Sequence, residues 1–323
     1  MSTSTASFTT PFWVIGGTGA LTLPGLLLRV TGVDVPPITQ SAIAGISLVA
    51  AAFLLAWAAE AAQTVIAGGL AIAFLALITV LPEYAVDILF SWKAAHDPAQ
   101  AHFAIANMTG ANRLLIGIGW SGIVLLAAIW AWRRRQPAQA RAGVALPAQS
   151  VIDLVLLLVA TAYALLLPWR GRLTLLDTGF LFALFGCYLW FLARSSARES
   201  ADDLLGPARA IALLPPRPRA GMLIGLFALA AMTIVAVAEP FAEGLVAIGQ
   251  HIHLDTFVLV QIVAPLASEA PELVIIALFV FAGRAQVGLQ ALVSSKVNQW
   301  TLLVGSIPLV YALAGGSIQG FVL

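Results

Sequence analysis

The sequence predicts an all-α fold, a polytopic transmembrane bundle of about nine helices that contains two inverted repeats. Composition is the first observation, because 61% of the 323 residues are hydrophobic and only 10% are charged, whereas soluble domains carry about 25% charged residues. The second is that the apolar residues form runs of about 20 or more, long enough to cross roughly 30 Å of hydrocarbon. The third is a similar order of motifs in the two halves of the chain.

The predicted helices follow from hydropathy and from the positions of helix breakers. They span about 11–31, 40–60, 63–93, 99–132, 148–168, 172–194, 220–250, 255–283 and 285–313. No basic residue precedes Arg29 and the first apolar run has no small-residue cleavage site, so we expect a retained helix rather than a signal peptide. The segments 63–93 and 99–132 are longer than one span requires, which predicts that they are tilted, broken or extended beyond the bilayer.

The distribution of arginine predicts the orientation of the chain in the membrane. The loops after the fourth and sixth helices are basic, through Arg133, Arg134, Arg135 and Arg141 in the one and Arg194, Arg198, Arg209, Arg217 and Arg219 in the other. Two helices separate these loops, so both lie on one side, which the positive-inside rule identifies as the cytoplasm. We therefore expect a multi-pass protein of a prokaryotic cytoplasmic membrane whose N-terminus lies inside.

The second basic loop also divides the chain into two halves. We predict an N-terminal membrane half at 1–194 with a first alpha-repeat at about 63–132, a cytoplasmic linker loop at 195–219, and a C-terminal membrane half at 220–323 with a second alpha-repeat at about 255–313. An odd number of helices separates the repeats, so they enter the membrane in opposite senses. Inverted repeats with a site at their interface near the midplane are a transporter architecture.

Two acids lie deep in these repeats. Counted back from Lys93 at 1.5 Å per residue, Glu83 is about 15 Å into the membrane, and Glu272 is about 18 Å from Arg284. A charged acid at that depth costs roughly 2.5–3.5 kcal/mol or more, which makes a function the default hypothesis. Each follows a proline, which can break the helix and free carbonyl oxygens beside the carboxylate, an environment that suits a hard cation. The alternative is a protonated acid bonded to a neighbouring helix.

Further acids lie one turn away. Asp87 follows Glu83 and Glu269 precedes Glu272 at spacings that put each pair on one helix face. Carboxylates held close together do not all ionise readily, so such a site can exchange protons for cations. We expect Asp87 and Glu269 to tune the charge of the site or couple it to protons, and a packing or gating role is the alternative.

The Pro-Glu helices, each followed by a helix rich in Asn, Ser and Gly, resemble the paired alpha-repeats of the cation/calcium exchanger superfamily, which includes the sodium/calcium exchangers. Repeats of that family read G-T-S-L-P-E and then G-N-x-x-G-S-N. The matching stretches are 78–83 with 106–112, and 266–272 with 294–298. The family pattern would place two further helices after the second repeat, beyond Leu323.

The resemblance implies a set of cation-binding residues. Glu83 and Glu272 are the implied central ligands of the metal ion. Thr79 and Ser268 match the threonine of the motif, and Asn107 and Asn112 match its asparagines. These oxygen donors are the residues that the resemblance predicts around the transported cation.

The sequence also departs from the family. The glycine before the threonine is missing in both repeats, the serine after it is Val80 or Glu269, and Ala111 replaces the serine of G-S-N. Two cationic residues, Arg113 and Lys296, enter the region. The set of oxygen ligands is therefore poorer than a calcium site favours, which points toward proton-coupled or monovalent exchange over sodium/calcium exchange.

Lys296 is the most informative departure. Counted from Arg284 it lies about 18 Å deep, too deep for its side chain to reach the interface easily. Its expected partner is a carboxylate of the site. Its ammonium can take the place of a bound metal ion or compete with an incoming cation, and a structural Lys–Glu pair is the alternative.

The predicted function is secondary active cation antiport by alternating access, similar to sodium/calcium exchange, with proton coupling as one form. The transported Ca²⁺, Na⁺ or H⁺ is the expected ligand and no cofactor is expected. The alternative is a non-transporting membrane sensor or assembly protein that retains the exchanger fold. We expect no enzyme, because the sequence shows no nucleophile–base pair. The expected partners are the lipid bilayer and inorganic cations, not nucleic acid, because the net charge is +1; a homo-oligomer is left open.

Overall fold

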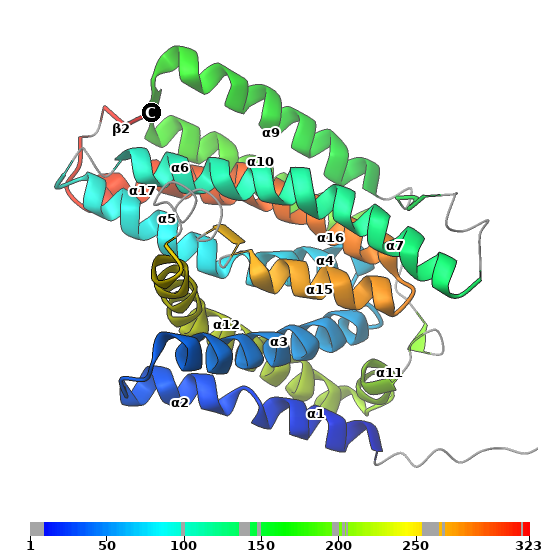
Figure 1. Cartoon of the computed structure of the whole chain (residues 1–323). Helices are drawn as coiled ribbons and strands as arrows, with labels where there is room; N and C mark the ends of the chain where they lie inside the picture. The colour runs from blue at the N-terminus through cyan, green and yellow to red at the C-terminus, as the bar shows by residue number, and fades with distance from the viewer. Residues whose placement is uncertain are drawn as a thin grey trace, which may run out of the picture.

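Helices make up almost all of the part of the chain that the structure describes (Figure 1). The computed structural model describes residues 10–97, 101–135, 143–146, 150–195, 200–201, 204, 206–253, 265–266, 269–317 and 319–323. Within these residues, six helices are long and apolar enough to cross a membrane, and α4 (Gly68–Thr79) and α15 (Ala270–Phe281) are shorter apolar helices. The predicted class, a polytopic helical membrane bundle, is confirmed.

The two repeats have the same internal order. The first consists of α4, α5 (Leu81–Ala94), α6 (Ala101–Asn112), the π-helical segment η2 (Arg113–Trp120) and α7 (Ser121–Arg133). The second contains α15, α16 (Ala285–Asn298), the π-helical segment η5 (Gln299–Leu303) and α17 (Val304–Leu313). Each π-helical segment directly follows an asparagine, Asn112 or Asn298, and such widened turns concentrate at functional sites.

Two predicted segments are divided in the structure, and a third is described only in part. The segment 63–93, which the sequence predicts to be tilted, broken or extended, is broken into two helices, α4 and α5, which meet at Val80 because Pro82 begins a new helix. The first predicted span, 11–31, is likewise divided into α1 (Thr10–Ala20) and α2 (Leu23–Thr31), whose first turn contains Pro24. The start of the predicted helix 255–283 falls mainly outside the described residues.

Four other helices agree with the predicted ranges within a few residues. They are α3 (Pro37–Ala62), α9 (Ser150–Arg170), α10 (Leu175–Ser195) and α12 (Pro216–His251). The linker 195–219 is more than a loop, because it contains α11 (Gly206–Ala212), whose Ala208 and Ile211 are buried among residues of α1, α3 and α12.

The helices form layers around the repeats (Figure 1). α3 and α12 pack along each other, and their apolar residues share one core cluster with residues of α4, α15 and α16. α1, α2 and α11 lie against this pair, whereas α9 and α10 cover α16, η5 and α17 on the other side. The interface between α4–α5 and α15–α16 is therefore the centre of the molecule.

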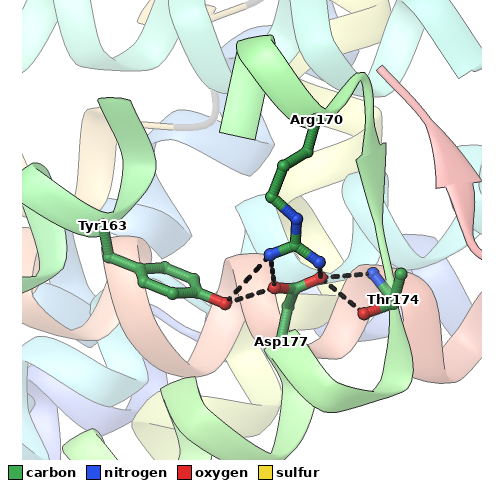
Figure 2. A network of polar contacts seen from close by, with 4 residues as sticks. All are labelled: Tyr163, Arg170, Thr174 and Asp177. Carbon is green, nitrogen blue, oxygen red and sulfur yellow. Dashed lines mark hydrogen bonds and ion pairs between the residues drawn. The ribbon is translucent and has the colours of Figure 1, made fainter. Parts of the chain in front are cut away.

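A polar network fixes the turn between α9 and α10 (Figure 2). Thr174, just before α10, donates from its backbone N and its Oγ1 to Asp177 Oδ2, at 2.6 and 2.7 Å. Arg170 pairs with both oxygens of Asp177, at 2.6 and 3.3 Å, and Tyr163 donates to Oδ1. The carboxylate thus caps α10 and ties it to the end of α9. Beside it, β1 (Arg172–Leu173) pairs antiparallel with β2 (Phe321–Val322).

We predict that Asp177→Ala destabilises the protein. A lost helix cap costs about 1 kcal/mol and a half-exposed ion pair up to about 1 kcal/mol, so the free energy of unfolding should fall by about 2 kcal/mol. Chemical unfolding in detergent micelles measures this, with the exposed Asp34→Ala as control. Unfolding of Asp177→Ala at the wild-type denaturant concentration would contradict the assigned role.

Candidate functional site

Glu83 and Glu272 each lie in the first turn of a helix that begins inside the bundle. α5 carries Pro82 in its first turn and α15 carries Pro271. Proline has no N–H to donate, which costs little in a first turn, where the amides lack intrahelical partners. The positive end of the helix dipole also favours a negative group at this position. The sequence therefore places both glutamates where a buried carboxylate is least unfavourable.

The site holds several buried ionisable groups. The side chains share almost complete burial: Glu83 is 1% exposed, Asp87 0%, Glu269 2%, Glu272 2% and Lys296 0%. Glu83, Glu269, Glu272 and Lys296 lie close enough to interact electrostatically. Each isolated charge would cost several kcal/mol to bury, so these groups depend on the opposite charge of Lys296, on hydrogen bonds or on protonation.

Gln299, which the sequence analysis did not single out, connects the two repeats. Its Nε2 donates to Glu83 Oε2 and, at 3.3 Å, to Glu269 Oε1. Its Oε1 accepts a hydrogen bond from Lys296 Nζ. One amide thus contacts a carboxylate of the first repeat, a carboxylate of the second, and the only cationic group that the described residues bring into this centre.

The hydrogen-bond partners of Lys296 are side-chain amides. Its Nζ donates to Asn112 Oδ1 at 2.8 Å and to Gln299 Oε1. Among the described residues the ammonium therefore bonds two amide oxygens, and it interacts with the expected carboxylate partners, Glu83, Glu269 and Glu272, through electrostatics. The reason is that an amide has both an acceptor and a donor, so Gln299 can stand between opposite charges and satisfy both.

Glu272 differs from Glu83 in its surroundings. Neither of its oxygens has a hydrogen bond of ordinary geometry from a described residue, although the Ser295 hydroxyl and the Glu269 carboxyl group lie close to it. Buried polar atoms in folded proteins nearly always have a partner. These oxygens are therefore suited to coordinate a cation or to accept a proton.

The structure describes only some of the other predicted site residues. Thr79 is buried one residue before the break between α4 and α5, and its hydroxyl donates to Ala76 O at 2.9 Å. Asp87 is buried one turn after Glu83. Asn107 belongs to α6, but its side chain lies outside the described part of the structure, as does Ser268 altogether.

As they stand, the acids do not form a closed metal centre. In the described part of the chain, no three His, Cys, Asp or Glu side chains converge closely enough to hold a metal ion. The lysine and the glutamine lie among the carboxylates instead. A cation that enters this site must therefore rearrange the contacts of Lys296 and Gln299.

Comparison with known proteins identifies the architecture. The family model described as sodium/calcium exchanger protein matches residues 38–194 and 222–322. The crystal structure of the H⁺/Ca²⁺ exchanger CAX is similar to the chain with a TM-score of 0.79 and 35% identity, covering 98% of this chain and 78% of that one. The sodium-calcium exchanger NCX_Mj, soaked with Na⁺ and Sr²⁺, shares the fold with a TM-score of 0.60 and 16% identity, covering 84% and 82%. No curated protein matches the sequence.

We predict that Gln299→Met destabilises the protein more than an exposed substitution of the same kind. Hydrogen bonds to charged groups contribute about 1.5–3 kcal/mol each, so the free energy of unfolding should fall by about 3 kcal/mol. Gln286→Met, at an exposed position on α16, is the matched control. Equal thermal unfolding temperatures for the two variants in detergent would show that the amide does not link the charges.

Proposed function

The chain belongs to the sodium/calcium exchanger protein family and is a multi-pass cation/calcium exchanger, and from this premise we propose that it exchanges Ca²⁺ for protons. In this proposal Glu83 and Glu272 bind the cation, and oxygens of Thr79, Ser268, Asn107 and Asn112 complete its coordination. Asp87, Glu269 and Lys296 set the charge of the site and its coupling to protons.

One observation carries the proposal. The Gln299 amide joins Glu83 of the first repeat to Glu269 of the second, at the point where two broken helices begin. In inverted-repeat transporters the site lies at the interface of the repeats, and movement of one part against the other exposes it to either side. Carboxylates held by both repeats therefore support a site that works by alternating access.

Two further observations favour protons as the counter-ion. The protein that is 35% identical over 98% of this chain is an H⁺/Ca²⁺ exchanger. Clustered buried carboxylates can release protons when a metal ion binds, because the ligands must be ionised. Lys296 also donates hydrogen bonds to the Asn112 and Gln299 oxygens. A monovalent cation would need these oxygens as ligands, which disfavours sodium as the counter-ion.

The orientation follows from the basic ends of the helices. α7 ends at Arg133, followed by Arg134 and Arg135, and Arg217 and Arg219 lie in the first turn of α12. The positive-inside rule favours this side as the cytoplasmic one. The proposed location is therefore the cytoplasmic membrane of a prokaryote, with the N-terminus inside.

We predict that Glu83→Gln and Glu272→Gln abolish exchange. Each variant removes a negative charge that must face the cation, and truncating one partner of a buried charge network costs about 3–5 kcal/mol, more than a hundredfold in affinity. The measurement is Ca²⁺ uptake into proteoliposomes driven by a pH gradient.

Glu243→Gln, an exposed acid of α12, is the matched control and should exchange at the wild-type rate. Full activity in both Glu83→Gln and Glu272→Gln would refute the assignment of the site. A wild-type protein that exchanges Ca²⁺ only against Na⁺ would refute proton coupling but not the site.

We predict that Lys296→Met increases cation affinity. Two unit charges about 6 Å apart interact by roughly 3 kcal/mol at an effective dielectric constant near 20, so removing the ammonium should tighten Ca²⁺ binding about tenfold or more. Na⁺ should also begin to stabilise the variant, because the Asn112 and Gln299 oxygens become available.

Ligand-dependent thermal shifts in detergent measure both effects. Lys93→Met, an exposed lysine at the end of α5, is the control. Weaker Ca²⁺ binding by Lys296→Met than by wild type would mean that the lysine organises the ligands rather than competing with the cation.

A further inference from the structure

A second buried acid lies outside the cation site, where α9 and α10 cover α16. Asp153, in the first turn of α9, is 1% exposed. The proposed exchange site makes no use of it. An ionisable residue buried within a membrane-spanning helix points to a functional role, so its surroundings are informative.

Tyr188 of α10 connects this acid to α16. Its hydroxyl donates to Asp153 Oδ1 at 2.7 Å and lies 2.7 Å from Ser294 Oγ. Gln290 of α16 is the other polar neighbour of the carboxylate, and η5 contributes the apolar Leu302 to this interface. Tyr188 is thus the titratable group that faces Asp153, and the groups from α16 are neutral.

The polar groups continue along α16 toward the cation site. Gln290, Ser294 and Asn298 follow at four-residue spacing, so they share one helix face, and all are buried. Asn298 Oδ1 accepts a hydrogen bond from the Tyr84 hydroxyl at 2.7 Å, and Tyr84 directly follows Glu83. A line of mostly buried polar side chains therefore leads from Asp153 toward Glu83.

Several atoms along this line have unmet hydrogen-bonding capacity. Within the described residues, Ser150 Oγ, Asp153 Oδ2, Ser295 Oγ and Asn298 Nδ2 are buried without a hydrogen-bond partner of ordinary geometry. Buried water typically bonds about three such groups in a protein interior. The line is therefore suited to hold hydrogen-bonded water between its side chains, and Ser295 brings it next to Glu272.

The line begins at the basic end of the bundle. Asp153 is about 5 Å along α9 from its start at 1.5 Å per residue, and Gln290 lies in the second turn of α16. In Figure 1 the start of α9 and the end of α7, which carries Arg133, lie toward the same end of the molecule, on the right. In the proposed orientation this end faces the cytoplasm.

We propose that Asp153, Tyr188 and Ser294 form a proton relay between the cytoplasm and the carboxylates of the exchange site. The relay rests on the proposed exchange of Ca²⁺ for protons. It gives Asp153 a role that differs from that of the acids that bind the cation: it moves protons and never contacts Ca²⁺.

Each transfer conserves protons. The Tyr188 hydroxyl, which donates to Asp153 in the structure, first rotates toward Ser294 Oγ. Asp153 then takes up a proton that arrives from the cytoplasmic side and donates it to Tyr188 Oη, while Tyr188 releases its own proton to Ser294 Oγ. Ser294 in turn releases its proton to water beside Ser295, from which Glu272 takes it up. Every O–H bond that forms is matched by one that breaks, so Asp153 returns to the carboxylate and both hydroxyls are restored by rotation.

Two transport modes of the full-length protein in proteoliposomes test the relay. Ca²⁺ uptake driven by a pH gradient requires net proton movement, whereas exchange of labelled for unlabelled Ca²⁺ at equal pH does not. Positioned proton-transfer groups contribute about 10²–10⁴-fold to rates. In Asp153→Asn we expect the proton-driven rate to fall about tenfold or more, while Ca²⁺ self-exchange stays within about twofold of wild type.

Tyr188→Phe keeps the ring and removes the hydroxyl, so it should show the same split even if Asp153→Asn folds poorly. The exposed Asp34→Asn is the matched control and should behave as wild type in both modes. An equal loss of both modes, or of neither, would overturn the relay. The wild-type protein could also exchange labelled for unlabelled Ca²⁺ but show no Ca²⁺ uptake driven by a pH gradient. That result would refute proton coupling itself, and the relay with it.

Discussion

Compensation of buried charge is the constraint on which the rest of this structure depends. Glu83, Glu269, Glu272 and Lys296 are almost fully buried, so bulk water and lipid headgroups contribute little to their stability. Gln299 solves part of this problem, because its amide donates toward two carboxylates and accepts from the ammonium. The charges remain close, yet the ammonium is not locked to a carboxylate, so an arriving cation or proton can change the balance.

The fold brings these groups together through repeated chain breaks. Pro82 and Pro271 start α5 and α15 in the interior, and the π-helical segments η2 and η5 follow Asn112 and Asn298 at equivalent points of the repeats. If each repeat were a continuous helix, its site residues would lie at different depths in the membrane and would not meet. The breaks therefore convert two separate sequence motifs into one site, which the α9–α10 hairpin supports by packing on η5 and α17.

Features that carry charge or a helix breaker could be predicted from sequence, whereas contacts between neutral side chains could not. Glu83 and Glu272 stand out because a carboxylate in an apolar run is costly, and the break at Val80 follows from Pro82. Gln299 carries no charge and matches no motif, so nothing in the sequence indicates that it separates Lys296 from the acids. The role of Asp153 likewise depends on Tyr188 and Ser294, which lie far from it along the chain and meet it only in the folded bundle.

The central claim is that Ca²⁺ and protons occupy the same carboxylates. Calorimetric titration of the purified protein with Ca²⁺, repeated in buffers of different ionisation enthalpy, measures the protons released on binding. Because ligands must be deprotonated to bind a metal ion, we predict release of about one or more protons per Ca²⁺ at neutral pH. Ca²⁺ binding whose heat is the same in every buffer, with no proton released, would contradict the account.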